Sequence, residues 1–419
     1  MKRIIIMALC LMGIISMSAQ SFEFDMSKPQ PLYSEGLGFG WDMLEYAHVP
    51  SAKELSGVYS GPAYFSVKVP DGNYKVTVTL GSKRKAGNTV VRAENRRLFL
   101  EAAPTKKGQF KTYSFIINKR SPYISDKERV KLKDRENEYF HWDDRLTLEF
   151  NGPSPAVRSI KIEVDTTALT IFLCGNSTVV DQNREPWASW GQMFPRWFDD
   201  KVAVSNHAES GLTAGSFLAS NRLDKVLQMM HKGDYVFCEF GHNDQKEHGP
   251  GDGAWYNFSH NLKLFIDKVR GRGGNIVFVT PTQRRRFEQG RIVETHGEYP
   301  DAMRAVARRE NVPVIEVHEM TRTFFESLGE ENSKRALVHY PVNTFPGQTT
   351  ELADNTHFNP FGAYEVSKMV VMGIKQLGLP MAKDLRGDWK DFDPSHPDDW
   401  HTYRWYASPV FEVKKPDGN

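Results

Sequence analysis

The stretch Leu169-Thr-Ile-Phe-Leu-Cys-Gly-Asn-Ser-Thr-Val179 decides the fold, because an apolar run leads directly into a glycine turn. A short, continuously apolar run is typical of a strand buried on both faces of a parallel sheet. We therefore predict an α/β domain of three layers, with a parallel sheet between helices, over residues 167–384. Further strands are predicted at 202–204, 234–240, 275–279 and 312–317, and helices at 217–230, 261–270, 300–309 and 361–377.

The residues before this domain follow a different pattern. Between 21 and 166, short segments alternate apolar and polar residues and are separated by turn residues, which predicts a β-sandwich. Tyr64-Phe-Ser-Val-Lys-Val69 and Tyr74-Lys-Val-Thr-Val-Thr-Leu80 flank Pro70-Asp-Gly72, so we expect these two strands to form a hairpin. Residues 385–419 have no clear period, and we expect this tail to pack back on both domains.

The N-terminus has the composition of a secretory signal peptide. Met-Lys-Arg is followed by an apolar run over 4–15 and then by small residues, so we assign 1–20 to a cleaved signal and expect a secreted or periplasmic protein. The run is short for a membrane span, and no later segment approaches the required length. Only Cys174 and Cys238 remain after cleavage, which excludes a disulfide-based scaffold.

The charge balance argues against a nucleic-acid partner. Lysine and arginine number 54 against 52 acidic residues, a formal net charge of +2, so composition imposes no large cationic surface. The densely charged stretch at 119–144 mixes both signs, and we expect it to be a solvated loop or edge. The oligomeric state is not predictable from these features.

Polar residues follow the predicted strands in chain order. Ser177 lies on the turn after the first strand, 206–211 and 241–244 follow the second and third, and Asp354 and His357 precede the last helix. Because the carboxyl ends of parallel strands meet at one edge of a sheet, we expect these groups to converge. A serine on such a tight turn is expected to be exposed.

These residue types supply the parts of a nucleophilic hydrolase. A serine hydroxyl needs a base to take its proton, and the base needs a third group to orient it, so we assign Ser177, His357 and Asp354 to these roles. An oxyanion formed during attack needs hydrogen-bond donors that are already in place. We assign this oxyanion hole to the backbone N–H groups of Ser177 and Gly211 and to the side-chain amide of Asn243.

Taken together, the four stretches resemble those of the SGNH (GDSL-like) hydrolase superfamily, named for Ser, Gly, Asn and His in four blocks. Over 170–378 the chain is most similar to the rhamnogalacturonan acetylesterase family. The resemblance implies a flavodoxin-like fold and a serine esterase, without cofactor, that removes O-acetyl groups from a plant cell-wall polysaccharide. The β-sandwich resembles galactose-binding-type modules. The supporting stretches are Gly175-Asn-Ser-Thr-Val179, Asn206-His-Ala-Glu-Ser-Gly211, Gly241-His-Asn-Asp244, Thr280-Pro-Thr-Gln-Arg-Arg285 and Ala353-Asp-Asn-Thr-His-Phe-Asn359.

Asn176 departs from the family pattern, which has aspartate before the nucleophile. Asparagine keeps the shape of the side chain but removes a charge and turns one acceptor into a donor. The serine, histidine and aspartate are untouched, so we expect activity to survive. The departure keeps open an alternative of another class, an inactive hydrolase domain attached to a carbohydrate-binding β-domain. Two alternatives within the same chemistry are a pectin methylesterase and an acetylxylan esterase.

Substrate contacts and metal ligands are predicted less directly. Arg284 and Arg285 follow the fourth strand, where guanidinium groups can face acidic sugars, and Trp187 is near enough to Ser177 in sequence to form a sugar platform. Helical spacing makes core packing the simpler role for the tryptophan. The histidines at 207 and 242 match no structural zinc spacing, so no metal is predicted; a metal-dependent hydrolase remains a rival that chelator sensitivity would expose.

Overall fold

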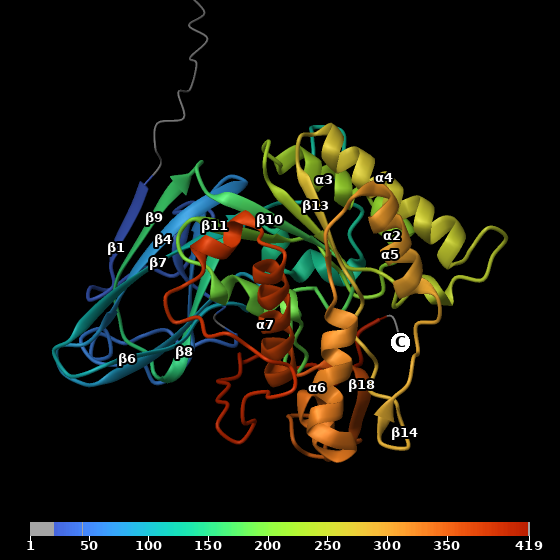
Figure 1. The fold of residues 1–419 in the computed structure, drawn as a ribbon. Helices are drawn as coiled ribbons and strands as arrows, with labels where there is room; N and C mark the ends of the chain where they lie inside the picture. Colours follow the sequence, from blue (N-terminus) through green and yellow to red (C-terminus); the bar gives the residue numbers. More distant parts are fainter. Residues whose placement is uncertain (1–20, 44, 418–419) are drawn as a thin grey trace, which may run out of the picture.

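The computed structural model describes residues 21–43 and 45–417; the predicted signal peptide lies outside the described residues. Two parts stand side by side in Figure 1, a β-sandwich and an α/β unit. Within the described part of the chain, no helix combines the length and the apolar character that a membrane crossing requires.

The α/β unit is built on a five-stranded parallel sheet, which confirms the sheet predicted from the sequence. In chain order its strands lie 2-1-3-4-5, the arrangement of flavodoxin-like folds. Cys174 pairs with Cys238 in register, and both are buried free thiols. The strands in spatial order are β11 (Val202–Asn206), β10 (Leu169–Cys174), β12 (Tyr235–Cys238), β13 (Asn275–Val279) and β16 (Val314–Ile315).

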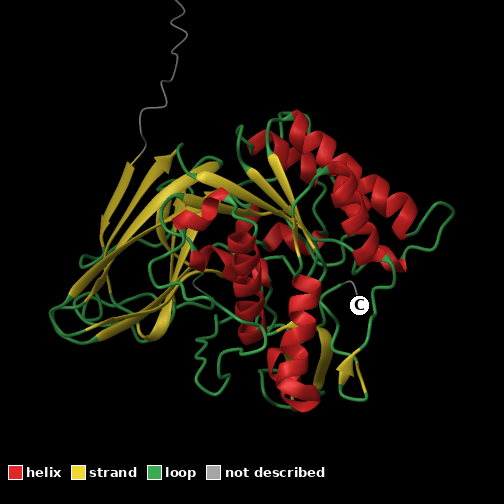
Figure 2. Ribbon diagram, in the orientation of Figure 1, coloured by secondary structure: helices red, strands yellow, loops and turns green. Residues whose placement is uncertain are grey.

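Helices cover both faces of this sheet, as Figure 2 shows. Successive side chains of a strand point to opposite faces. Phe172 and Val236 pack with α2 to α5, whereas Leu173 and Phe237 pack with α1, α6 and α7. The helices are α1 (Trp190–Met193), α2 (Ala214–Ala219), α3 (Arg222–Met229), α4 (Ser259–Gly271), α5 (Tyr299–Glu310), α6 (Val317–Asn332) and α7 (Pro360–Gln376).

Two helices differ from the sequence prediction. The helix expected over 217–230 is divided into α2 and α3, because Asn221 adopts a left-handed conformation with φ of 61°. The sequence pattern did not predict α6, whose buried side includes Phe324 and Phe325 but whose C-terminal turn is interrupted at Gly329. These differences do not alter the order of the layers.

The first part of the chain forms two antiparallel sheets packed face to face. Their facing side chains, among them Phe65, Val76, Phe115 and Leu148, form one apolar core. The four-stranded sheet contains β1 (Ser21–Asp25), β9 (Val157–Asp165), β4 (Gly72–Gly81) and β7 (Phe110–Lys119) in that order. The five-stranded sheet contains β2 (Phe39–Asp42), β3 (Ala63–Lys68), β8 (Arg145–Ser154), β5 (Gly87–Ala93) and β6 (Arg97–Thr105).

The hairpin predicted around Pro70 is wrong, because β3 and β4 belong to different sheets. The connection between them crosses the edge of the sandwich instead of reversing within one sheet. Asp71 fixes this crossing through ion pairs with Lys119 of β7 and Lys225 of α3, at 3.1 and 2.7 Å.

The charged stretch at 119–144 is exposed over 125–129, as expected of a solvated segment, but some of its charged side chains are buried. It lies between the two parts of the molecule, where Arg120 is fully buried and Glu136 pairs with Arg222 of α3 at 2.5 Å. The mixed signs allow charges to be buried in pairs, which a stretch of one sign could not do.

The tail after α7 runs back over both parts. Trp389 packs edge-on against Trp197 at 5.1 Å, and the Tyr406 carbonyl accepts a hydrogen bond from Arg92 of β5. Further on, the tail pairs with the segment around Glu185: the Glu185 N–H donates to the Val410 carbonyl, and the Glu412 N–H donates to the Glu185 carbonyl. The tail therefore ends beside the carboxyl ends of the parallel strands.

Candidate active site

Ser177, His357 and Asp354 meet above the parallel sheet although 180 residues separate the serine from the histidine. Ser177 Oγ lies 2.9 Å from His357 Nε2, and His357 Nδ1 lies 2.8 Å from Asp354 Oδ2. The serine follows β10. The other two belong to β18 (Leu352–Phe358), which pairs with β17 (Leu337–Tyr340).

Hydrogen bonding orders the protons along this chain of groups. Carboxylate oxygens only accept, so His357 Nδ1–H donates to Asp354, and His357 Nε2 can accept the proton of the Ser177 hydroxyl. Burial raises the pKa of Asp354, but hydrogen bonds from His357 and the Thr356 N–H outweigh it and lower the pKa below its usual range. The carboxylate therefore stays ionised beside the imidazole.

The turn that carries Ser177 requires glycine at position 175. A Cβ there would lie 2.6 Å from the Val179 side chain and 3.0 Å from the Glu239 carbonyl oxygen. Ser177 itself is only 4% exposed, so the expectation of an exposed serine is wrong. Gln182 and Ser189 both donate to its carbonyl oxygen and hold the following segment across the turn.

Asn176 serves as an acceptor in this turn. Its Oδ1 accepts from the Thr178 N–H at 3.1 Å and lies 2.9 Å from the Thr178 hydroxyl. The same hydroxyl lies 2.5 Å from the buried carboxyl of Glu239. Burial raises the pKa of Glu239 to about 7. The amide oxygen of Asn176 thus makes the contacts that shape the turn without a charge.

The predicted oxyanion donors lie on three loops, which carry Ser177, Gly211 and Asn243 and follow β10, β11 and β12. The Glu209 N–H donates to the Gly175 carbonyl at 3.3 Å and brings the Gly211 loop beside the serine turn. Gly211 has φ of 80°, a conformation that favours glycine. Asn243 Nδ2 donates one hydrogen to the Leu212 carbonyl at 3.1 Å, and Lys246 Nζ donates to Asn243 Oδ1 at 3.3 Å. Both ends of the carboxamide are therefore held in place.

The β-sandwich part contributes to the same loop, which sequence reasoning missed. Lys133 Nζ donates to the Ser210 carbonyl at 2.6 Å. Arg135 pairs with the buried Glu209 at 2.6 Å and also donates to the Ser210 carbonyl. No local sequence signal points to these contacts, because their partners lie more than 70 residues away.

A cavity of about 220 Å³ adjoins this site. Trp187 lines it, with its ring 5.8 Å from the His357 ring, and its Nε1 donates to the Glu412 carbonyl of the tail. Lys415 of the tail lies 3.4 Å from Asp354 Oδ2. The cavity walls therefore come from the α/β unit, the sandwich and the tail, and include Arg135, Gln182, Arg184, Ser210, Lys414 and Lys415.

Comparison with known proteins identifies the family to which this chain belongs. Residues 173–363 match the GDSL-like lipase/acylhydrolase family. Rhamnogalacturonan acetylesterase RhgT of Bacillus subtilis (strain 168) is 44% identical over 220 residues, which cover 52% of this chain and 94% of that protein. The chain belongs to the GDSL-like lipase/acylhydrolase family. It is a carboxylic ester hydrolase, as the sequence predicted.

Two other relatives come from the same bacterium. The probable rhamnogalacturonan acetylesterase YesY is 30% identical over 220 residues, covering 51% of this esterase and 96% of that protein. The uncharacterized esterase YxiM is 25% identical over 328 residues and covers 75% of each chain. The second alignment is longer than the α/β unit of the esterase, so it extends beyond the part that carries the three central residues.

Two of the predicted substrate contacts are engaged elsewhere in the esterase. Arg284 donates to the carbonyls of Thr295 and His242, at 3.3 and 3.0 Å. Arg285 donates to Ser333 Oγ and to Asn355 Oδ1, at 2.9 and 3.0 Å. In the described residues these guanidinium groups brace loops around the site and do not line the cavity beside Trp187.

Proposed function

We propose that this esterase removes O-acetyl groups from an acetylated pectic polysaccharide of the rhamnogalacturonan type, through an acyl-serine intermediate. The observation that carries the proposal is the hydrogen-bonded series Ser177, His357 and Asp354 at the carboxyl edge of the sheet. Its support on the substrate side is the similarity to RhgT and YesY, whose names give that activity.

Each step of the proposed reaction uses a group already in position. Ser177 Oγ attacks the acetyl carbonyl carbon while its proton passes to His357 Nε2, and the carbonyl electrons form an oxyanion beside Gly211 and Asn243. When the oxyanion collapses, the bond to the sugar oxygen breaks and His357 protonates that oxygen. Water then gives a proton to His357 and attacks the acyl-serine. The bond to Ser177 Oγ breaks, His357 returns the proton to Oγ, and acetate leaves.

The charges around the site favour an anionic polymer over a neutral one. Burial, together with the nearby charges of Arg284 and Lys415, lowers the pKa of Lys246 to about 8. Three cations thus lie close together next to the predicted oxyanion donors. A uronate carboxylate bound beside Lys246 and Lys415 would relieve this repulsion, whereas a neutral xylan has no group that does so.

The products released from defined polymers test the proposal. We expect the enzyme to release acetate from acetylated rhamnogalacturonan faster than from acetylated xylan, and to release no methanol from methyl-esterified pectin. Ser177→Ala should lose about 10⁴-fold or more of the acetate release, while Ser220→Ala serves as a matched control. Methanol as the main product, or full activity of Ser177→Ala, would contradict the proposal.

We also propose that the enzyme acts after export, as residues 1–20 imply. N-terminal sequencing of the protein recovered outside the cytoplasm should find a chain that begins near residue 21. A chain that still begins with Met1 would exclude cleavage.

A further inference from the structure

A compact cluster of Glu294, His296 and His318 lies behind the loop that carries Asn243. Glu294 and His296 lie between β15 (Arg291–Ile292) and α5, and His318 lies in the first turn of α6. Each residue offers one ligand atom, and these atoms are all within 4.8 Å of one another. The imidazoles are buried, at 0% and 1% exposure, while the Glu294 side chain is 39% exposed.

His318 Nε2 lies between the Glu294 carboxylate and the side-chain amide of Gln283. His318 Nδ1 lies 2.8 Å from the Pro281 carbonyl oxygen, which only accepts, so this nitrogen carries the proton. In the neutral ring, Nε2 is then an acceptor. It lies 2.7 Å from Glu294 Oε2, which is also an acceptor. Two acceptors at this distance repel each other unless a positive charge lies between them. The side-chain nitrogen of Gln283 lies 2.7 Å from His318 Nε2 and must turn away before Nε2 can bind a cation.

His296 has a compatible arrangement on the other side of Glu294. Its Nε2 lies 3.0 Å from His242 Nδ1, and His242 Nε2 lies 3.1 Å from Thr282 Oγ1. When His296 Nε2 donates to His242, and His242 donates to Thr282, His296 Nδ1 keeps a lone pair, and a cation can replace its long contact of 3.4 Å with the Thr295 hydroxyl. That atom lies 3.5 Å from Glu294 Oε1.

We propose that Glu294, His296 and His318 bind a divalent first-row transition ion, of which Zn²⁺ is the representative. Two imidazole nitrogens and one carboxylate oxygen form a donor set that suits such ions and does not suit Mg²⁺ or Ca²⁺. The exposed side of Glu294 leaves room for water as a further ligand. No metal is predicted from the sequence, because the histidines at 207 and 242 match no zinc spacing. The proposed site uses different residues.

The surrounding groups have the roles usual around a metal. Ligand histidines commonly donate their second N–H to a carbonyl or another acceptor, which fixes the ring, and Pro281 and His242 serve as these acceptors. Bonds of about 2.1 Å require ligand atoms about 3.4 Å apart, so the Glu294 carboxylate must rotate slightly away from His318.

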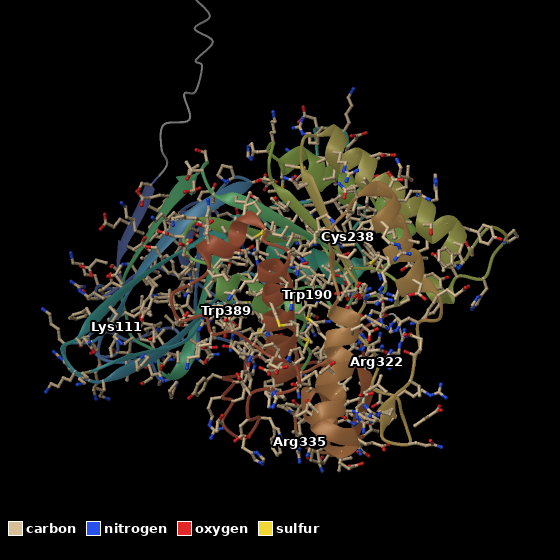
Figure 3. The ribbon with its side chains drawn as sticks, in the orientation of Figure 1. Lys111, Trp190, Cys238, Arg322, Arg335 and Trp389 are labelled. Atoms are coloured by element: carbon tan, nitrogen blue, oxygen red, sulfur yellow. The ribbon has the colours of Figure 1, made fainter. Side chains whose placement is uncertain are left out.

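Nearby protein cations compensate Glu294 only weakly. Arg322, which projects from α6 in Figure 3, approaches Glu294 Oε2 no closer than 3.8 Å. Arg284 donates to the main-chain carbonyls of Thr295 and His242.

The position of the site assigns the ion a bracing role. It would join the loop before α5 to α6, and His242 would extend this link to the neighbouring Asn243. The serine, histidine and aspartate lie on other elements, β10 and β18, so the ion takes no part in the attack. Its loss is expected to lower stability before it lowers activity.

Cobalt titration of the untagged mature protein tests the proposal. The protein is first freed of metal with a chelator and then titrated with Co²⁺ while visible absorption is recorded. We expect absorption bands that saturate at about one equivalent and disappear when Zn²⁺ displaces Co²⁺. Saturating Zn²⁺ should raise the unfolding midpoint by about 3 °C or more, because it binds the folded state alone.

Matched variants separate this site from adventitious binding. Glu294→Gln should weaken Co²⁺ binding about 10-fold or more and abolish the thermal shift, and it avoids cutting into the core as His318→Ala would. Glu326→Gln, on the neighbouring face of α6, should bind Co²⁺ as the wild type does. The proposal is overturned if the wild type gives no saturable bands, which would mean a proton on His318 neutralises Glu294, or if Glu294→Gln binds equally well.

Discussion

At the scale of single residues, Lys246 links the charge around the site to the orientation of Asn243. Its ammonium group donates to Asn243 Oδ1, and the amide on the other side donates to Leu212. A cation on the carbonyl end of a carboxamide polarises its N–H groups and makes them stronger donors. The charge of Lys246 therefore strengthens the oxyanion donor proposed for Asn243.

This arrangement predicts an alkaline limit to activity. Because the pKa of Lys246 is lowered to about 8, the charged amine is present below about pH 8 and is lost above it. We expect kcat on a small acetyl ester to fall as the pH rises through this value. Lys246→Met should reduce kcat at pH 7 about 10-fold, or about 1.4 kcal/mol, and should flatten the alkaline limb.

Initial rates between pH 6 and 9.5 provide the measurement, with the exposed Lys268→Met as the control. A Lys246→Met enzyme with the same alkaline limb as the wild type would show that another group is responsible.

The candidate catalytic residues could be located at the strand ends from the sequence, but the residues that hold their loops in place could not. Ser177, Asp354 and His357 were found because a parallel sheet brings its carboxyl ends to one edge, and the structure brings all three together. Lys133 and Lys415 do not follow strands of the parallel sheet, so this rule could not locate them. Their relation to the site depends on how distant segments pack, which a single sequence does not encode locally.

At the scale of elements, the loop over 133–139 of the sandwich part determines how firmly the Gly211 loop is held. Lys133 and Arg135 both donate to the Ser210 carbonyl, one residue before the glycine. A donor that shifts by about 1 Å loses much of its stabilisation of a transition state. The sandwich part thus helps to position the active site, whether or not it binds sugars.

Removal of one of these contacts gives the element-scale prediction. Lys133→Met should lower kcat on a small acetyl ester about 10-fold and change KM little, because the lost contact positions a donor without touching the substrate. Lys131→Met is the matched control, since Lys131 Nζ donates to the Ala219 carbonyl, away from the Gly211 loop. Equal kcat values for the two variants would refute this positioning role.

The elements that the sequence mispredicted share a physical cause. The alternation around Pro70 correctly indicates strands, but the choice of partner strand depends on contacts such as those of Asp71 with Lys119 and Lys225. Likewise, α6 is hidden because its apolar residues are few and Gly329 interrupts its last turn. The periodicity of apolar residues predicts which face of an element is buried, but it does not predict which other elements that face packs against.

At the scale of the whole molecule, buried ion pairs join the two parts. Arg222 of α3 pairs with Glu136, and Arg97 of β6 lies 3.3 Å from Asp181, with all four side chains almost completely buried. Burial raises the pKa of Glu136, but Arg222 outweighs this effect and the net pKa is lowered. An ionised carboxylate without its partner would be costly at this interface.

Arg222→Met is therefore expected to lower the free energy of unfolding by about 3–5 kcal/mol. Urea unfolding followed by fluorescence and by circular dichroism should show one shared transition for the wild type, because the core and the ion pairs are continuous across the two parts. Arg308→Met, on the exposed face of α5, should change stability by no more than about 0.5 kcal/mol. Two separate wild-type transitions would mean that the parts unfold independently.

The position of the tail has a practical consequence for anyone producing this protein. Lys415 and Asp417 lie at the rim of the cavity, and Asp417 pairs with both Lys133 and Arg135. A purification tag joined directly after Asp417 would lie beside this entrance and hinder the entry of a polymer chain. A tag placed ahead of β1 would begin at the far end of the sandwich and leave that entrance clear (Figure 1).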